Sequence, residues 1–381
     1  AEYSATTGSD EITITADPTV KDVGYTVTFN GSESNVVALA EGENNIEIKV
    51  KNAEGLEKTY TLKVTRTPAS KVKFSVNPSD AVVFVLDPNR NRMWPNENGE
   101  FAFIPGVQYT YNVTSHGYIG KTETVTANED TVIMVNLEKA PVTKFTEYES
   151  SWPSFGLNEE NNIVIDRPTP RTKDETALYW ATKVVEVSNI GSESGYNNNP
   201  VGVPILVNDY LYTYAKDKLF KIDKMSGEIL EMGTMTGGTS TFAICSLAYG
   251  EGLIFVGLNG GTVQAFNAET LESVWVYRDS LGGQPNGQLT YNDGYLYTGF
   301  WNGESKTANY SCISVTDEDP ADTKETKLAT WSHTQMGGFY WAGAYVDEDY
   351  LYIGTDDGSA EGTSTNTHLL SIDKRSGKVV D

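Results

Sequence analysis

The stretch NDYLYTYAKDKLFKIDKMSGE at residues 208–228 decides the fold, because its pattern returns three times along the chain. A polar turn precedes an aromatic–aliphatic strand, and a second polar turn leads into a strand that ends in Asp-x-x-Ser-Gly. The strand motif recurs as GEGLIF at 250–255, NDGYLY at 292–297 and DEDYLY at 347–352. Motif positions 210, 253, 295 and 350 are spaced by 43, 42 and 55 residues. A period near 40–45 residues predicts four-stranded propeller blades.

The turn at the end of each repeat is also conserved in form within the chain. It reads DKMSGE at 223–228, NAETLE at 267–272 and DKRSGK at 373–378. The Asp or Asn side chain caps such a turn, and glycine tolerates its positive φ. A tryptophan marks the outer part of the predicted blades: Trp180, Trp275 and Trp331. The third spacing is longer because residues 317–327 form an acidic, turn-rich insert.

These turns resemble the repeats of the pyrroloquinoline-quinone-type β-propellers, whose pattern is roughly φ-x-A-φ-D-x-x-T-G-K-x-x-W. The resemblance covers about 200 residues and implies a propeller, which some members use only as a scaffold or docking surface. The quinone dehydrogenases add a disulfide between adjacent cysteines and a calcium site, and no two cysteines adjoin here. Pyrroloquinoline quinone is therefore not expected. Closed propellers of this class usually have roughly seven or eight blades, so four repeats indicate either a four-bladed ring or, as we expect, part of a longer chain.

The first segment, residues 1–68, alternates apolar and polar residues and predicts a small antiparallel β-sandwich. Its stretches EGENNIEIKV at 41–50 and KTYTLKVTR at 58–66 resemble the bacterial cadherin-like repeat. That resemblance implies an extracellular spacer. Residues 69–142 predict a second sandwich, which resembles the PEGA domain through Pro78, the alternation around residues 81–86, Pro105-Gly106 and Gly117-Tyr118. Another immunoglobulin-like sandwich remains an alternative.

Residues 143–176 are predicted to be a proline-containing linker, and residues 177–381 to be the propeller blades. Within the linker, the apolar triplet at 163–165 is predicted to be a strand that helps to close the next domain. The fold class is thus all-β: two small β-sandwich domains followed by a β-propeller of at least four four-stranded blades.

Composition limits the function. With 28 Lys and Arg against 52 Asp and Glu, the formal net charge is −24, which opposes binding to nucleic acid and anionic lipid. No apolar run approaches the ~20 residues of a membrane-spanning helix, so we expect no membrane insertion. No signal segment opens the sequence, and this does not argue for the cytoplasm. Cys245 and Cys312 are interpreted as two free thiols, with a disulfide as the alternative. Only three histidines occur.

A ligand site is predicted where the loops of the later repeats bring polar and aromatic residues to one face. Its candidate residues are Gln284, Asn286, Trp301, Tyr340 and Trp341. The glycine doublets before the first strands of the repeats support this interpretation, although glycine also lets strands crowd near a propeller axis. The expected ligand is a protein or a glycan.

Acidic turns would suit calcium, which prefers oxygen ligands. The candidates are Asp347, Asp349, Asp356 and Asp357, together with the acids at 317–319. None matches the twelve-residue calcium loop, and solvated turn acids are the alternative. No catalytic residue is assigned, because His333 stands alone near the predicted axis and no phosphate-binding glycine motif occurs.

The sequence therefore predicts an extracellular or cell-surface binding or scaffold protein without enzymatic activity. Its propeller would be the docking surface and its sandwiches would be spacers. The alternative is an enzyme, either a quinone-dependent dehydrogenase or a carbohydrate-active propeller enzyme.

Overall fold

The computed structural model describes residues 2–15, 24–166, 168–184, 201–238, 247–341, 343–356 and 367–381. Apart from one 3₁₀ turn, η1 (Lys173–Glu175), every regular element in these ranges is a β-strand, which confirms the all-β class. No helix in the described ranges is long and apolar enough to cross a membrane. The predicted thiol Cys245 and the predicted metal ligand Asp357 lie outside the described residues.

The chain forms two compact units. The first holds residues 1–79, 83–111 and 122–136, and the second holds residues 80–82, 112–121 and 137–381. The domain boundaries given above stay predictions.

The N-terminal sandwich pairs a four-stranded sheet of order β1-β6-β5-β3 with the two-stranded sheet β2-β4. Its strands are β1 (Glu2–Thr7), β2 (Glu11–Thr13), β3 (Tyr25–Phe29), β4 (Val36–Ala38), β5 (Gly42–Asn52) and β6 (Glu57–Arg66). The alternating apolar residues of these strands meet in a core of Ile14, Phe29, Leu39, Ile46 and Val64. The predicted sandwich is confirmed, and its edge is filled by β1, which runs parallel to β6.

The next two sheets have the orders β10-β7-β13 and β12-β11-β8-β9. Their strands are β7 (Ser70–Asn77), β8 (Val82–Leu86), β9 (Arg92–Met93), β10 (Glu100–Phe103), β11 (Gln108–Thr114), β12 (Lys121–Thr126) and β13 (Thr131–Asn136). Aromatic side chains fill the space between them: Phe74 packs edge-on against Phe101, and Phe103 stacks on Tyr109. The assignment of this sandwich to the PEGA domain stays a prediction.

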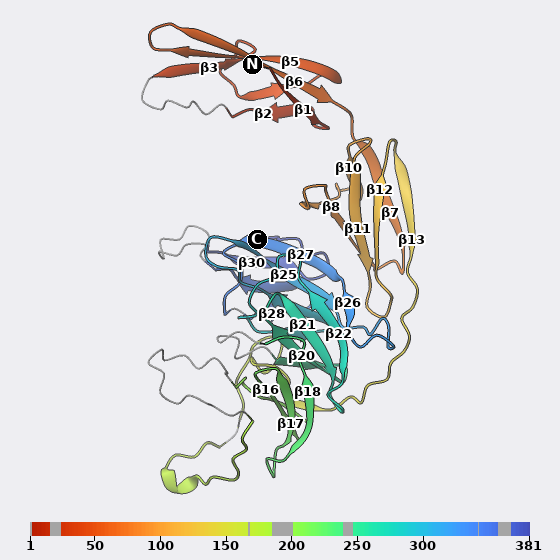
Figure 1. The fold of residues 1–381 in the computed structure, drawn as a ribbon, viewed down its shortest axis with the longest axis vertical. Helices are drawn as coiled ribbons and strands as arrows, with labels where there is room; N and C mark the ends of the chain where they lie inside the picture. Colours follow the sequence, from red (N-terminus) through yellow and green to blue (C-terminus); the bar gives the residue numbers. More distant parts are fainter. Residues whose placement is uncertain are drawn as a thin grey trace. The chain divides into compact units, whose positions relative to one another are not determined.

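Four successive sheets follow in the second unit, one for each predicted repeat (Figure 1). The first repeat sheet contains β14 (Ser150–Trp152), β15 (Ile205–Val207), β16 (Tyr210–Ala215), β17 (Lys218–Asp223) and β18 (Ile229–Thr234). The second contains β19 (Leu247–Gly250), β20 (Leu253–Leu258), β21 (Thr262–Asn267), β22 (Ser273–Arg278) and β26 (Glu325–Lys327). The third contains β23 (Thr290–Asn292), β24 (Tyr295–Gly299), β25 (Thr307–Ser314) and β27 (Ala329–Met336). The fourth contains β28 (Tyr345–Val346), β29 (Tyr350–Gly354) and β30 (Leu369–Asp373).

The second sheet gains a strand that the repeat pattern did not predict. The acidic insert at 317–327 leaves β25, crosses to the preceding sheet and pairs β26 parallel to β22. The insert is therefore not only a surface loop, because its last residues cover the outer edge of the second sheet.

The segment predicted to be a linker is packed along the sheets. Its strand is β14, which pairs antiparallel with β15, and Ser154 forms a bridge to Ala248 of β19. Farther along, the Val346 amide donates to the Glu159 carbonyl oxygen, and Asn161 Nδ2 donates to that of Ala344. Residues 150–161 thus lie beside the first strands of several repeat sheets.

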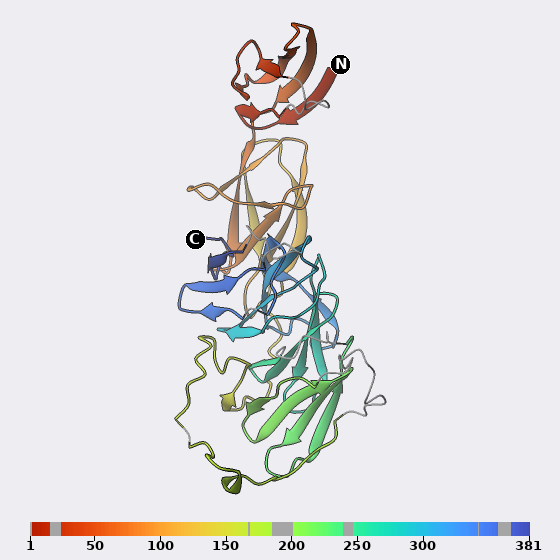
Figure 2. The ribbon, with the colours of Figure 1, turned by 90° about the vertical axis from the view of Figure 1, so that its left-hand side faces the viewer.

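The predicted strand at 163–165 is wrong. These three residues have no regular structure, and their side chains are 51%, 82% and 50% exposed. The edge that they were expected to complete is taken by β14. Figure 2 shows the following stretch, in yellow-green, as an irregular trace with one short turn.

Apolar side chains join each sheet to the next. One core cluster combines residues of the first and second sheets, and another combines residues of the second and third. Trp275 of β22 and Trp331 of β27 are fully buried. Trp275 Nε1 donates to the Val315 carbonyl oxygen at 3.1 Å. Trp331 Nε1 donates to that of Lys374 at 2.9 Å. Each tryptophan therefore ties its sheet to the next repeat.

Candidate functional site

Three of the predicted ligand residues form one aromatic cluster. Trp301 follows β24, and its ring centroid lies 4.9 Å from that of Tyr340. Tyr340 stacks on Trp341, with centroids 4.5 Å apart and an angle of 18° between the ring planes. We call Trp301, Tyr340 and Trp341 the aromatic cluster. Trp301 comes directly after β24 of the third sheet, and Tyr340 and Trp341 come from the loop that leads into the fourth sheet.

Exposure increases along this loop from Phe339 to Trp341. Phe339 is fully buried against Tyr310, whereas Tyr340 is half-buried and Trp341 is 60% exposed. Trp341 has a φ of +56°, a left-handed conformation that bulky residues adopt rarely. Such an outlier is held in place by its surroundings and is a reason to suspect function. Here it presents a large apolar ring to solvent.

Polar neighbours fix the orientation of Trp301. Its Nε1 donates to Asp356 Oδ2 at 2.8 Å, and its backbone exchanges two hydrogen bonds with that of Gln284. Asn286 is fully buried, and its Nδ2 donates to Gln284 Oε1 at 3.3 Å. Asn286 therefore supports Gln284 from below and does not reach the surface itself.

Two of the predicted calcium ligands, Asp347 and Asp356, accept hydrogen bonds from other residues. Asp347 Oδ1 accepts hydrogen bonds from the amides of Asp349 and Tyr350, which lower the pKa of this carboxyl. Asp356 accepts the Trp301 indole hydrogen, and Asp349 is an exposed turn residue. Among the described residues no group of three or more His, Cys, Asp or Glu side chains could hold a metal ion. Calcium binding stays a prediction.

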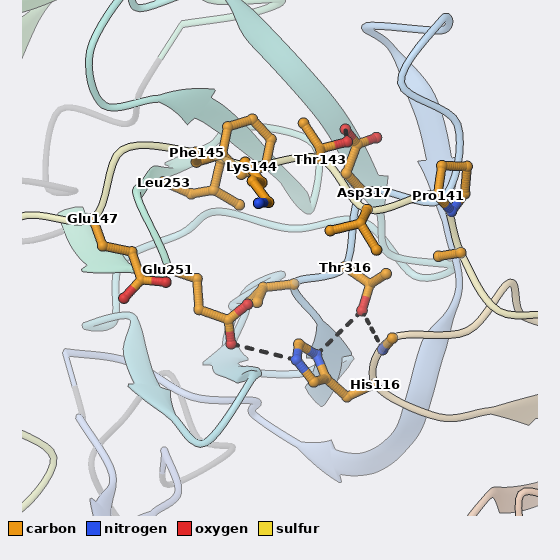
Figure 3. Close-up of a pocket in the computed structure, with 14 residues that line it drawn as sticks. His116, Pro141, Thr143, Lys144, Phe145, Glu147, Glu251, Leu253, Thr316 and Asp317 are labelled. Carbon is orange, nitrogen blue, oxygen red and sulfur yellow. Dashed lines mark hydrogen bonds and ion pairs between the residues drawn. The ribbon is translucent and has the colours of Figure 1, made fainter.

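A second candidate site, which the sequence did not predict, is a cavity of about 530 Å³ in the second unit (Figure 3). Loop residues 116–117, the segment 140–147, the start of β20 and residues 315–317 line it. His116 Nε2 lies 3.4 Å from Glu251 Oε1, and His116 Nδ1 lies 3.1 Å from Thr316 Oγ1. Glu251 Oε1 also accepts a hydrogen bond from the Tyr291 hydroxyl at 2.9 Å.

A carboxylate, an imidazole and a hydroxyl follow one another here, as they do where an imidazole base activates a hydroxyl as a nucleophile. In this cavity, however, the Thr316 hydroxyl oxygen already accepts a hydrogen bond from the Gly117 amide at 2.7 Å and contacts Ser314 Oγ at 2.9 Å. These bonds hold the loop at 116–117 against the third repeat sheet. We therefore interpret the group as structural.

Beside the cavity lies a buried charge cluster that consists of Asp317, Glu318, Glu325 and Lys327. The Lys327 side chain is 1% exposed, and its Nζ contacts Glu318 Oε1, lies 3.9 Å from Glu325 Oε1 and donates to the Thr316 carbonyl oxygen. Asp317 Oδ2 accepts from Thr143 Oγ1 at 2.7 Å. Burial raises the pKa of both Asp317 and Glu325.

The remaining predicted residues, Cys312 and His333, lie in strands of the third repeat sheet. Cys312 is a free, buried thiol in β25, as predicted, and burial raises its pKa well above the usual range. His333 lies in β27, where it pairs with Tyr310 of β25. Sequence reasoning missed His116, Glu251 and Lys327. The only available signal was that the chain has just three histidines.

Comparison with known proteins confirms the resemblance to the cadherin-like repeat. Residues 1–67 match the family model of the cadherin-like beta sandwich domain. No curated protein matches the sequence closely enough to count as a relative.

Similar solved structures include a quinohemoprotein alcohol dehydrogenase from Pseudomonas putida HK5, with 15% identity, a TM-score of 0.46, and coverage of 61% of this chain and 40% of that one. The corresponding enzyme from Comamonas testosteroni has 15% identity, a TM-score of 0.44 and coverage of 60% and 40%. BamB from Moraxella catarrhalis has 13% identity, a TM-score of 0.32 and coverage of 46% of each chain. The chain thus spans less than half the length of these proteins. All three TM-scores lie below 0.5, so these likenesses carry no argument about this chain.

Proposed function

We propose that this chain is an extracellular or cell-surface protein that binds a neutral carbohydrate at the aromatic cluster, without catalysing a reaction. The observation that supports the proposal best is the stack of Trp301, Tyr340 and Trp341, which ends in an exposed tryptophan held at positive φ. Strained backbone positions cluster at functional sites, and contiguous exposed apolar patches mark interaction surfaces.

A sugar suits this surface for two reasons. The face of an aromatic ring carries partial negative charge, and the C–H groups on one side of a pyranose ring carry partial positive charge. Polar groups at the rim, such as those of Gln284 and Asp356, are of the type that orients sugar hydroxyls.

The charge of the chain limits which sugars are suitable. A formal net charge of −24 repels polyanions such as sulfated or uronic-acid polysaccharides. A neutral oligosaccharide experiences no such repulsion. The cadherin-like domain at 1–67 fits the role of a spacer in an extracellular protein, and it is the support for the proposed location.

Replacing Trp341 by Ala is expected to weaken binding of a neutral hexasaccharide by at least tenfold, which corresponds to ~1.4 kcal/mol. The probes are cellohexaose, xylohexaose and chitohexaose, with heparin as the polyanion, and the measurement is isothermal titration calorimetry. Trp94→Ala is the matched control, because Trp94 is also an exposed tryptophan (42%), covered by the Arg92 guanidinium. The affinity of the Trp94→Ala variant for the hexasaccharide should equal that of the unaltered chain.

No detectable binding to any of the three neutral hexasaccharides or to a wider glycan array would contradict the proposal. So would binding that survives the loss of Trp341. If a protein ligand loses affinity with Trp341→Ala while no sugar binds, the cluster is a protein-docking surface instead. The enzyme alternative has its own test, since a stoichiometric cofactor spectrum after addition of pyrroloquinoline quinone and Ca²⁺ would contradict a purely binding role.

A further inference from the structure

A smaller cavity, of about 300 Å³, shares part of its wall with the cavity drawn in Figure 3. Its wall comes from the packed segment 147–159, from residues 248–251 between β19 and β20, and from Tyr291 of β23. Glu147 and Glu251 line both cavities. Ligand sites usually have volumes of about 300–1,000 Å³, so the smaller cavity suits one small chemical group.

The wall of the smaller cavity is negatively charged. Glu147, Glu159 and Glu251 line it, and no Lys, Arg or His of the described residues does. Within the described parts of the chain, the side chains of Glu147 and Glu159 have no hydrogen bond or ion pair. Two carboxylates in this wall are therefore not neutralised by the chain itself.

The third carboxylate is held in place by one of its oxygens. Glu251 Oε1 accepts a hydrogen bond from the Tyr291 hydroxyl at 2.9 Å and lies 3.4 Å from His116 Nε2. In the described structure Oε2 has no such partner and stays available as an acceptor. The other phenol in the wall, that of Tyr249, is bonded to the backbone of Tyr148. Both tyrosine hydroxyl hydrogens are therefore already used.

Ser154 gives independent evidence for a ligand in this cavity. Ser154 is 6% exposed, and its backbone forms a bridge to Ala248 of β19. Its side chain has no hydrogen bond to any of the described residues. The hydroxyl oxygen keeps some accessible surface, so a group in the cavity can reach it. Buried polar groups are nearly always hydrogen-bonded, so this hydroxyl points to a partner that the chain does not supply.

An alkylammonium group has the complementary chemistry. It carries one positive charge and three N–H donors that turn about a single bond, so it can reach acceptors on separate segments of the chain. A metal ion needs ligands that converge on one point, and no group of three or more acidic, His or Cys side chains among the described residues could hold one. The formal net charge of −24 also attracts cations.

We propose that the smaller cavity binds a primary ammonium group, which is the end of a free amine or the side chain of a lysine in a partner protein. Glu147, Glu159 and Glu251 surround the positive charge, and Ser154 Oγ accepts one of its hydrogen bonds. The cavity and the aromatic cluster have no residue in common, so this inference does not depend on the proposed sugar site.

Isothermal titration calorimetry of the 1–381 chain in about 150 mM NaCl tests the proposal. The probes are n-butylamine, putrescine and the capped tripeptide Gly-Lys-Gly. We expect saturable binding of an amine, but none of 1-butanol, which lacks the charge, or of butyltrimethylammonium, which lacks the donors. Glu159→Gln should weaken amine binding by about tenfold or more. Glu149→Gln is the matched control, because Glu149 is an exposed residue of the same segment outside both cavities, and its affinity should be unchanged.

The probes also separate the two sources of the ammonium group. Binding of putrescine at least as tight as that of the tripeptide identifies a free amine, and tighter binding of the tripeptide identifies a lysine side chain. The proposal is overturned if no amine binds saturably, or if butyltrimethylammonium binds as tightly as n-butylamine. Equal weakening by Glu159→Gln and Glu149→Gln would overturn it too, because only the general negative charge would then attract the amine. Trp341→Ala should leave amine binding unchanged, which separates this site from the sugar site.

Discussion

Lys327→Met is expected to lower the free energy of unfolding of the repeat unit by about 3–5 kcal/mol at pH 7.5, because it leaves buried carboxylates without their cation. The Lys327 side chain is 1% exposed and faces Glu318 and Glu325. Met fills a similar volume, so the loss comes from charge rather than from a cavity. The measurement is urea unfolding followed by tryptophan fluorescence.

The effect depends on pH in a defined direction. Burial raises the pKa of Asp317 and Glu325 even with Lys327 present, and its charge opposes that rise. Without Lys327 both pKa values rise further. When the pKa of a carboxyl is higher in the folded than in the unfolded state, ionisation of that carboxyl opposes folding. The free energy of unfolding therefore falls as the pH rises from the unfolded-state pKa, about 4, through the folded-state pKa. The difference between variant and unaltered chain should therefore be largest at pH 7.5 and smaller at pH 5.

The control is Lys224→Met. Lys224 pairs with Asp209 at 2.5 Å, but the two side chains are 36% and 61% exposed. A pair so open to water contributes about 0–1 kcal/mol, and its removal should matter little at either pH. If both variants lose the same small amount, the charges at 317–327 are not an important part of the fold.

The repeated sheets could be predicted from the sequence because their pattern is local. Hairpins such as β16–β17 and β20–β21 carry their own alternation and their own turn, so each motif identifies its strands without reference to the rest. The added strands β14 and β26 could not be found in this way. Each has three residues and pairs with a strand far from it in sequence, so nothing in its local pattern distinguishes it from a loop.

The same distinction applies to the candidate sites. Trp301, Tyr340 and Trp341 were predicted because they stand near glycines in loops that the repeat pattern brings to one face. The pair of His116 and Glu251 joins residues 135 positions apart (251 − 116), which only the fold brings together. Lys327 lies in an acidic insert whose composition is typical of a solvated surface loop. Its burial follows from β26, which the sequence did not reveal.

Gly377→Ala is expected to destabilise the repeat unit by about 2–5 kcal/mol, the sum of two costs. Gly377 has a φ of +72°, and an L-residue there loses about 1–2 kcal/mol. The new Cβ would also lie 2.6 Å from Trp331 Cε3, and forcing extra volume into a packed core costs about 1–3 kcal/mol. Trp331 is fully buried and has no space to retreat. Thermal unfolding followed by circular dichroism measures the loss.

Gly260→Ala separates the two costs, because Gly260 has a φ of +77° but no atom within 4 Å of the added Cβ. It should lose only the backbone part. A double variant completes the argument: Trp331→Ala alone costs about 3–5 kcal/mol, and adding Gly377→Ala to it should cost only the backbone part, since the colliding ring has gone. If the two losses simply add, Trp331 does not press on Gly377, and the tie between the third and fourth repeat sheets lies elsewhere.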